Sequence, residues 1–403
     1  MVGVDIFDVV SRTDRTPRRA NEPYFAFLNR SGSQFFNPVR DLLQSWLNRV
    51  PAPHQNGIVG ALRSGSDEQF DSAFWELYLH QTLTSLGVEI TLHPDLPGTS
   101  KHPDFLVHAD HPYYLEAVST GTTPAKLKRQ ARLSEVEAVL DAVRVENWTL
   151  SFSWHEVGPA PLASARVRDT LLRWLNGLDE DSATAARKYD DLPTLRISDA
   201  GWELKFTALP VAAGRDAPLV AVRGAGRAFV VDNKTALRRV IYSKAKRYGT
   251  NIPHPLVTAV LSNQEVPTRT YDVVPVLYGR HPLGPAEVTD PSELAEDGHW
   301  RTREGWRRSH NPHIVVAADL HLYNLHTRPL WGFRTLDPRV EAGLELPWTA
   351  SVDLDVAEPQ TPSTTPHLDA LGIASDWCGI PPDFDERVQS AAGSARPTGL
   401  TEH

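Results

Sequence analysis

Residues 71–86 of this chain carry apolar side chains almost all the way round a helical projection. A helix with one apolar stripe lies on a surface, whereas a helix that is apolar nearly all round is buried on more than one side. Glu76 lies within this stretch, between Trp75 and Leu79. Removing a carboxylate from water is costly unless a partner or a metal ion compensates, so the sequence requires such a group near Glu76.

The residues after this helix predict β-structure. Gly87 ends the helix, and residues 88–92 alternate as a strand does. Residues 105–107 and 113–115 are rich in aromatic and branched side chains, and turn-forming residues separate them. We therefore expect a β-hairpin over this part of the chain.

Two carboxylates flank the hairpin. Asp104 lies immediately before its first strand and Glu116 immediately after its second. Two hard oxygen donors placed so close together make a site for Mg²⁺ or Mn²⁺ that leaves room for phosphate and water. Taken alone, Asp104 is also typical of a turn, and Glu116 of a solvent-facing strand. Two interpretations of Glu76 stay open. It is either a buried partner in a structural ion pair or an outer ligand of the metal.

This order of a Glu-bearing helix, an Asp-bearing strand and a Glu-x strand resembles the PD-(D/E)XK nuclease superfamily, which has the restriction-endonuclease-like fold. The resemblance implies an α/β protein with a mixed central sheet flanked by helices. It also implies that Asp104, Glu116 and the carbonyl of Ala117 bind the metal. Val118 occupies the position of the motif lysine.

Further phrases look like a group of bacterial proteins without a settled activity, which suggests work on nucleic acid in genome defence. These phrases are residues 72–80, 103–107, 114–117, 244–249 and 255–260.

A lysine that replaces the motif residue must face the sheet. On the helix predicted over residues 123–143, Lys126 shares the apolar face. On the helix predicted over residues 234–248, Lys244 lies in the middle of an apolar stripe. A lysine in such a stripe usually extends its ammonium to the edge of the core, so this ordinary role stays open. Lys101, in the loop before the motif, is a third candidate.

Two runs of residues combine basic and aromatic side chains, as contacts with nucleic acid require. One lies on the helix predicted over residues 234–248 and the other between residues 301 and 308. A solvated helix face and a polar loop explain these runs as well. The residues that we expect to contact the substrate are Arg129, Arg238, Lys246, Arg247 and Arg307.

Composition excludes several classes of protein. Cys378 is the only cysteine, so neither an internal disulfide nor a thiolate zinc site can form. No apolar run approaches the roughly 18 residues that a membrane span needs, and the first twenty residues lack a signal-peptide core, so we expect a soluble cytoplasmic protein. The net charge of −9 argues against indiscriminate binding of polyanions.

We place the PD-(D/E)XK-like core at residues 71–160. The helix over residues 123–143 and a strand over residues 149–154 complete its order of helix, three strands, helix and strand. We expect residues 161–345 to add α/β elements to the same domain, because no low-complexity linker separates the blocks.

The two ends of the chain differ from this core. Residues 1–70 predict an N-terminal helical extension, with one helix over residues 35–47. Residues 346–403 read as a Pro/Ser/Thr linker and a flexible tail, with a short docking element over residues 368–384.

Together these features predict a metal-dependent endonuclease that hydrolyses phosphodiester bonds, with DNA as the expected substrate. Its catalytic set would be Asp104, Glu116, Glu76, Lys126 and Lys244. The alternative is a catalytically inactive protein of the same fold that binds nucleic acid or acts as a scaffold. An interaction protein without a nucleic-acid partner is a third possibility. A homodimer and a defence-system partner both stay open.

Overall fold

The structure is a computed structural model. It describes residues 4–16, 18–19, 22–121, 124–143, 145, 147–179, 191–211, 220–225, 233–249, 252–264, 267–279, 297–302, 304–307, 309–340, 344–352 and 366–378. The chain divides into two compact units, which are described separately. Unit 1 comprises residues 1–16, 23–121 and 232–403, and unit 2 comprises residues 17–22 and 122–231.

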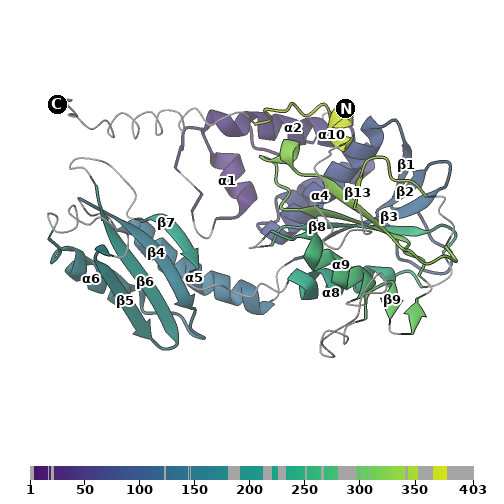
Figure 1. Ribbon diagram of the computed structural model, residues 1–403. Coiled ribbons are helices and arrows are strands. Elements are labelled where there is room, and N and C mark those ends of the chain that lie inside the picture. The colour runs from purple at the N-terminus through teal and green to yellow at the C-terminus, as the bar shows by residue number, and fades with distance from the viewer. Residues whose placement is uncertain are drawn as a thin grey trace, which may run out of the picture. The chain divides into compact units, whose positions relative to one another are not determined.

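Unit 1 is built on a mixed seven-stranded sheet (Figure 1). In sheet order its strands are β1 (Glu89–Leu92), β2 (Phe105–His108), β3 (Tyr113–Ser119), β8 (Leu256–Ser262), β11 (His313–Ala318), β12 (Leu330–Arg334) and β13 (Ala350–Ser351). The first three strands are antiparallel, β3, β8 and β11 run parallel, β12 is antiparallel to β11, and β13 is parallel to β12. The prediction of an α/β protein with a mixed central sheet is therefore confirmed.

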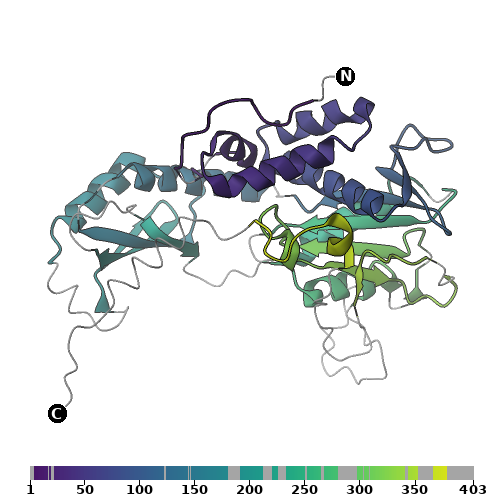
Figure 2. The same ribbon diagram turned by 90° about the horizontal axis from the view of Figure 1, so that it is seen from above.

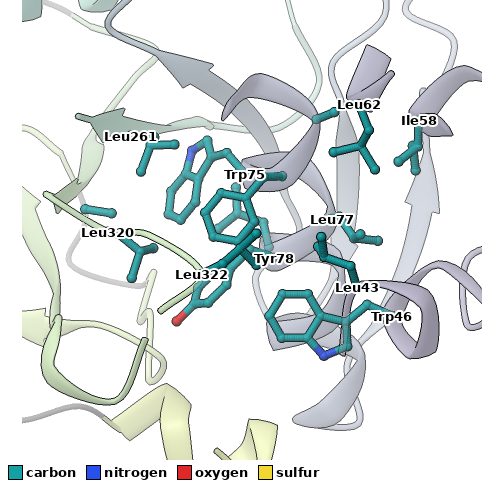
Figure 3. Close-up of a cluster of buried hydrophobic side chains, with 14 of the residues drawn as sticks. Leu43, Trp46, Ile58, Leu62, Trp75, Leu77, Tyr78, Leu261, Leu320 and Leu322 are labelled. Atoms are coloured by element: carbon teal, nitrogen blue, oxygen red, sulfur yellow. The ribbon is translucent and has the colours of Figure 1, made fainter. Parts of the chain in front are cut away.

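Helices cover both faces of this sheet. They are α4 (Asp67–Ser85), α8 (Asn233–Ala245) and α9 (Thr270–Tyr278). Figure 3 shows Trp75 and Tyr78 of α4 in one buried cluster with Leu261 of β8. Ile241 of α8 packs in another cluster, with Val260. Because neighbouring side chains on a strand point to opposite faces, α4 and α8 lie on opposite sides of the sheet.

The start of α4 follows ordinary capping chemistry. The Ser66 hydroxyl accepts a hydrogen bond from the backbone N–H of Gln69 at 3.4 Å, and two acidic residues occupy the first turn. Gly87, with a φ of 73°, follows the end of the helix. The helix begins four residues before the predicted start, and its buried side chains include Phe70 and Leu79, which confirms burial on more than one side.

Short helices from both ends of the chain pack around α4 (Figure 2). They are α1 (Tyr24–Arg30), η1 (Gln34–Phe36), α2 (Asn37–Leu47), α3 (Ala52–Leu62) and α10 (Pro366–Leu371). The Trp377 indole N–H donates to the carbonyl of Leu322 at 2.7 Å, so the predicted docking element is present in part. Residues 353–365 and 379–403, which hold most of the predicted linker and tail, lie outside the described residues.

Unit 2 has its own four-stranded sheet and its own core. Its elements in chain order are α5 (Pro124–Ala142), β4 (Trp148–Glu156), α6 (Ser164–Leu175), β5 (Thr194–Asp199), β6 (Trp202–Pro210) and β7 (Val220–Ala225). The rings of Phe152 and Phe206 stack with centroids 5.0 Å apart on neighbouring strands. Val136 of α5 and Leu171 of α6 pack in the same cluster.

This division corrects the predicted core order. The helix over residues 123–143 and the strand over residues 149–154 exist as α5 and β4, but β4 pairs with β6 and β7 and not with the seven-stranded sheet. Within unit 1, the helix and strand that follow β3 in the chain are α8 and β8, so unit 2 is inserted between β3 and α8. The elements of residues 161–345 therefore divide between two units. The residue pattern defines each element locally, whereas strand pairing is a long-range choice.

The longest helices, α4 and α5, have 19 residues each and carry charged side chains. Within the described ranges, no helix combines the length and the apolar composition that crossing a bilayer would demand.

Candidate active site

Asp104 and Glu116 occupy opposite positions on neighbouring strands. Phe105 of β2 pairs with Leu115 of β3, so the next pair along the hairpin joins Asp104 to Glu116. Directly opposite residues of an antiparallel pair point to the same face. The Asp104 carboxylate also accepts a hydrogen bond from the backbone N–H of Ala117 at 2.7 Å, which ties it to β3. The hairpin thus brings the two acids together.

Glu116 is buried, with 1% of its surface exposed. Three groups donate hydrogen bonds to its carboxylate: the Lys244 ammonium and the Arg247 guanidinium to Oε1, the latter at 3.2 Å, and the Tyr248 hydroxyl to Oε2. Lys244 and Tyr248 are four residues apart, at the C-terminal end of α8 and in the turn that follows. A buried carboxylate needs such partners to offset its lost hydration. The interpretation of Glu116 as a solvent-facing residue is wrong.

Asp104 experiences a surplus of negative charge. Burial raises its pKa well above the usual value, and the charges of Glu116 and Glu76 raise it further. Lys244 and the N–H of Ala117 act in the opposite direction without cancelling the rise. Three carboxyl groups therefore lie near enough to oppose one another's ionisation, which is typical of functional sites.

Glu76 reaches this region from α4. Burial, followed by the charge of Glu116, raises its pKa to about 7. Its Oε1 lies 3.5 Å from Nε2 of His93. Burial and the neighbouring histidines lower the pKa of His93, while the charge of Glu116 acts in the opposite direction. Both interpretations of Glu76, the structural ion-pair partner and the outer metal ligand, stay predictions.

The segment before β2 is anchored to the turn after α8. The Lys101 ammonium donates to the carbonyl of Arg247 at 3.1 Å, and the Tyr248 hydroxyl lies 3.0 Å from the carbonyl of His102. From the other side, the N–H of His93 donates to the carbonyl of Asp104 at 3.0 Å. Asp104 is thus held by contacts from both neighbouring strands, and the residues just before it are held by the turn after α8.

Three predicted substrate contacts form no hydrogen bond with the two acids among the described residues. Arg238 is half-buried on α8, and Lys246 is exposed just beyond it. Arg307 pairs with Asp297 at 3.0 Å. Across the part of the chain that the structure describes, none of the three donates to Asp104 or Glu116, whereas Arg247 does.

The other basic candidates belong elsewhere in the chain. Lys126 and Arg129 are part of α5 in unit 2, and the side chain of Lys126 lies outside the described residues. Arg303 and Arg308, from the second basic run, also lie outside them. Their proposed roles stay predictions.

Tyr248 and His93 are site residues that the sequence analysis did not identify. Tyr248 is the last residue of the helix predicted over residues 234–248, and its four-residue spacing from Lys244 is the signal that could have placed it at the site. His93 has a left-handed backbone with a φ of 47°, an uncommon conformation for a residue other than glycine, and the sequence gives no sign of it.

The donor set is suited to a hard divalent cation. A carboxylate offers about four acceptor positions, and Glu116 uses three of them for hydrogen bonds. Asp104 uses Oδ2 for the N–H of Ala117. Mg²⁺ sites often have only one or two protein carboxylates, because water and substrate phosphate supply the remaining ligands. Among the described residues, no group of three or more His, Cys, Asp or Glu side chains is arranged to hold a metal.

Comparison of the chain with protein-family models, with curated proteins and with solved structures found no match. The functional argument consequently depends on the geometry of the site.

Proposed function

We propose that unit 1 is a Mg²⁺- or Mn²⁺-dependent nuclease with a restriction-endonuclease-like core. The core would consist of α4, the meander β1–β3, α8 and β8, with unit 2 as an insertion. Support comes from the order of these elements and from the register that sets Asp104 opposite Glu116. In this proposal Asp104, Glu116 and the carbonyl of Ala117 bind the cation.

The contact between Lys244 and Glu116 is the observation that carries the proposal. Val118, at the motif lysine position, lies two residues beyond Glu116 and so points to the same face of β3. Val118 packs against the cluster that contains Ile241 of α8. A lysine from α8 thus enters the face that a lysine at position 118 would have occupied, and it supplies the charge that the sequence motif lacks.

When bound, the cation would lower the pKa of a water molecule and stabilise negative charge on the phosphate. The chain's own residues would supply positive charge, phosphate contacts and proton transfer. Lys244, which is 18% exposed, would hold a proton and a positive charge beside Glu116. Arg247, which is 41% exposed, would donate to phosphate oxygens at the rim of the site. Glu76, with its pKa near 7, would accept or release a proton close to neutral pH.

The proposed substrate is nucleic acid, with DNA expected, and the proposed setting is bacterial genome defence. Phosphodiester chemistry suits a site in which carboxylates and cations alternate, because the carboxylates hold the metal and the cations face the phosphate.

One observation favours a second candidate, a catalytically inactive protein that binds nucleic acid or acts as a scaffold. Both oxygens of Glu116 already accept hydrogen bonds from the side chains around it. Such a self-neutralised acid could persist as a structural element without any cation.

A cleavage assay tests the proposal and separates the two candidates. Purified protein is incubated with plasmid, single-stranded DNA and RNA in Mg²⁺, in Mn²⁺ and in EDTA. We expect Asp104→Asn and Glu116→Gln each to lower the rate at least about 100-fold, because each removes a charge that the transition state requires. Lys128→Met, at an exposed lysine of α5, is the control and should cleave normally. Cleavage that survives both acid substitutions would refute the assignment, and an inactive protein that still binds nucleic acid would favour the second candidate.

A further inference from the structure

The hydroxyl of Tyr248 lies within reach of two hydrogen-bond acceptors on other residues, but it has only one proton to donate. It is within hydrogen-bonding distance of Glu116 Oε2 and 3.0 Å from the carbonyl of His102. A phenol carries a single O–H, so it can donate to only one acceptor at a time.

The ring of Tyr248 is fixed by packing. Only 7% of the residue is exposed, and it belongs to a buried cluster with Tyr114 and Leu256. The guanidinium of Arg247 lies 5.6 Å from the ring centroid. Rotation of the hydroxyl hydrogen is therefore the motion that remains available to this side chain without repacking.

Both acceptors belong to elements that carry the proposed metal ligands. Glu116 is one ligand, and His102 lies two residues before Asp104, which is the other. The choice of acceptor therefore affects how far apart the carboxylates of Asp104 and Glu116 lie. Groups that orient a ligand in this way commonly affect both metal affinity and activity.

We propose that Tyr248 is a positioning residue whose hydroxyl holds Glu116 in the cation-free site and turns to the His102 carbonyl when Glu116 binds a cation. The inference rests on the proposed function. In the first arrangement the O–H donates to Oε2. In the second it donates to the carbonyl of His102, so Oε2 becomes available to the cation while the segment that carries Asp104 stays in register. One hydrogen bond replaces another, and no covalent bond changes.

Tyr248→Phe removes the hydroxyl and keeps the ring, so it tests the proposal directly. The full-length variant should bind Mn²⁺ about 10-fold to 100-fold more weakly, as measured by the paramagnetic resonance of free Mn²⁺. Its kcat for plasmid cleavage should fall with the KM for plasmid unchanged. Tyr242→Phe is a matched control, because Tyr242 is also on α8 but lies beside His299, with ring centroids 5.2 Å apart. This variant should behave as the unsubstituted protein does.

A second measurement shows whether Tyr248 acts through Glu116. Mn²⁺ affinity is compared for Glu116→Gln alone and for Glu116→Gln combined with Tyr248→Phe. If the tyrosine works through that carboxylate, Tyr248→Phe should cost less Mn²⁺ affinity in the Glu116→Gln background than in the unsubstituted protein, because the exchange between the two acceptors is then already lost. A full additional loss would overturn the proposal, and it remains measurable even if Tyr248→Phe alone is less stable.

The outcomes separate this inference from the proposed function. Equal Mn²⁺ affinity in Tyr248→Phe and the unsubstituted protein would overturn the positioning role, whether or not cleavage occurs. If the unsubstituted protein binds Mn²⁺ but cleaves no nucleic acid, the nuclease proposal fails, and the Mn²⁺ affinities still decide the role of Tyr248. If it binds no Mn²⁺, both fail.

Discussion

Replacing Glu76 with glutamine should change how the stability of unit 1 depends on pH. The folded protein holds the pKa of Glu76 at about 7, whereas the ordinary value is 4.5. Folding therefore favours the protonated acid. The stability that this preference contributes is complete below pH 4.5 and is lost as the pH rises through 7. The gap of about 2.5 pH units corresponds to about 3 to 4 kcal/mol, at about 1.4 kcal/mol per unit.

The assay is urea unfolding in EDTA at pH values between 4.5 and 8, followed by tryptophan fluorescence. The free energy of unfolding of the unsubstituted protein should fall relative to that of Glu76→Gln by up to about 3 kcal/mol across this range, because the glutamine cannot ionise. Asp104 should add to the difference, since the charge of Glu76 helps to raise its pKa.

Glu89→Gln is the matched control for this experiment. Glu89 is an exposed residue of β1 in the same unit, so its substitution should leave the pH dependence as it is in the unsubstituted protein. If the curves of Glu76→Gln and the unsubstituted protein stay parallel from pH 4.5 to 8, the burial argument for Glu76 is wrong.

Three further perturbations have defined outcomes. Lys244→Met removes a cation from the buried Glu116. It should therefore abolish measurable cleavage in the activity assay and lower the free energy of unfolding, measured by urea titration, by about 3 kcal/mol. Gly298→Ala should cost more stability than Gly57→Ala, because a Cβ at 298 would lie 2.2 Å from the backbone nitrogen of Gly279, whereas no atom lies within 4 Å of a Cβ at 57. Thermal unfolding compares the two variants, and equal midpoints would contradict the steric argument. Chelation by EDTA should stop cleavage and added Mg²⁺ should restore it, whereas unchanged rates in EDTA would refute the metal requirement.

Local pattern was sufficient to predict several elements. The nearly continuous apolar surface of residues 71–86 identified α4, and the branched and aromatic runs identified β2 and β3. The stripe over residues 234–248 identified α8. Each of these signals depends on side chains within one or two turns or one hairpin, which is the range over which residue periodicity carries information.

The insertion of unit 2 could not be read in the same way. An amphipathic helix followed by an alternating strand looks alike whether the strand joins the first sheet or starts a second one. Residues 313–318, which form β11, were also missed. A short run that is buried on both faces shows no alternation and resembles part of a buried helix.

The identity of the site lysine shows why the rest required coordinates. Lys126 and Lys244 both lie in apolar stripes and both follow Glu116 in the chain. Helical geometry alone therefore does not show which of them lies near Glu116. What separates them is the sheet to which each helix belongs. α8 packs on β3 and β8, and its last turn reaches Glu116, whereas α5 packs in the core of unit 2. A positive charge beside Glu116 is therefore defined by position in space, and in the proposed nuclease site a residue 128 positions away from Glu116 in sequence would take the place of a lysine at position 118.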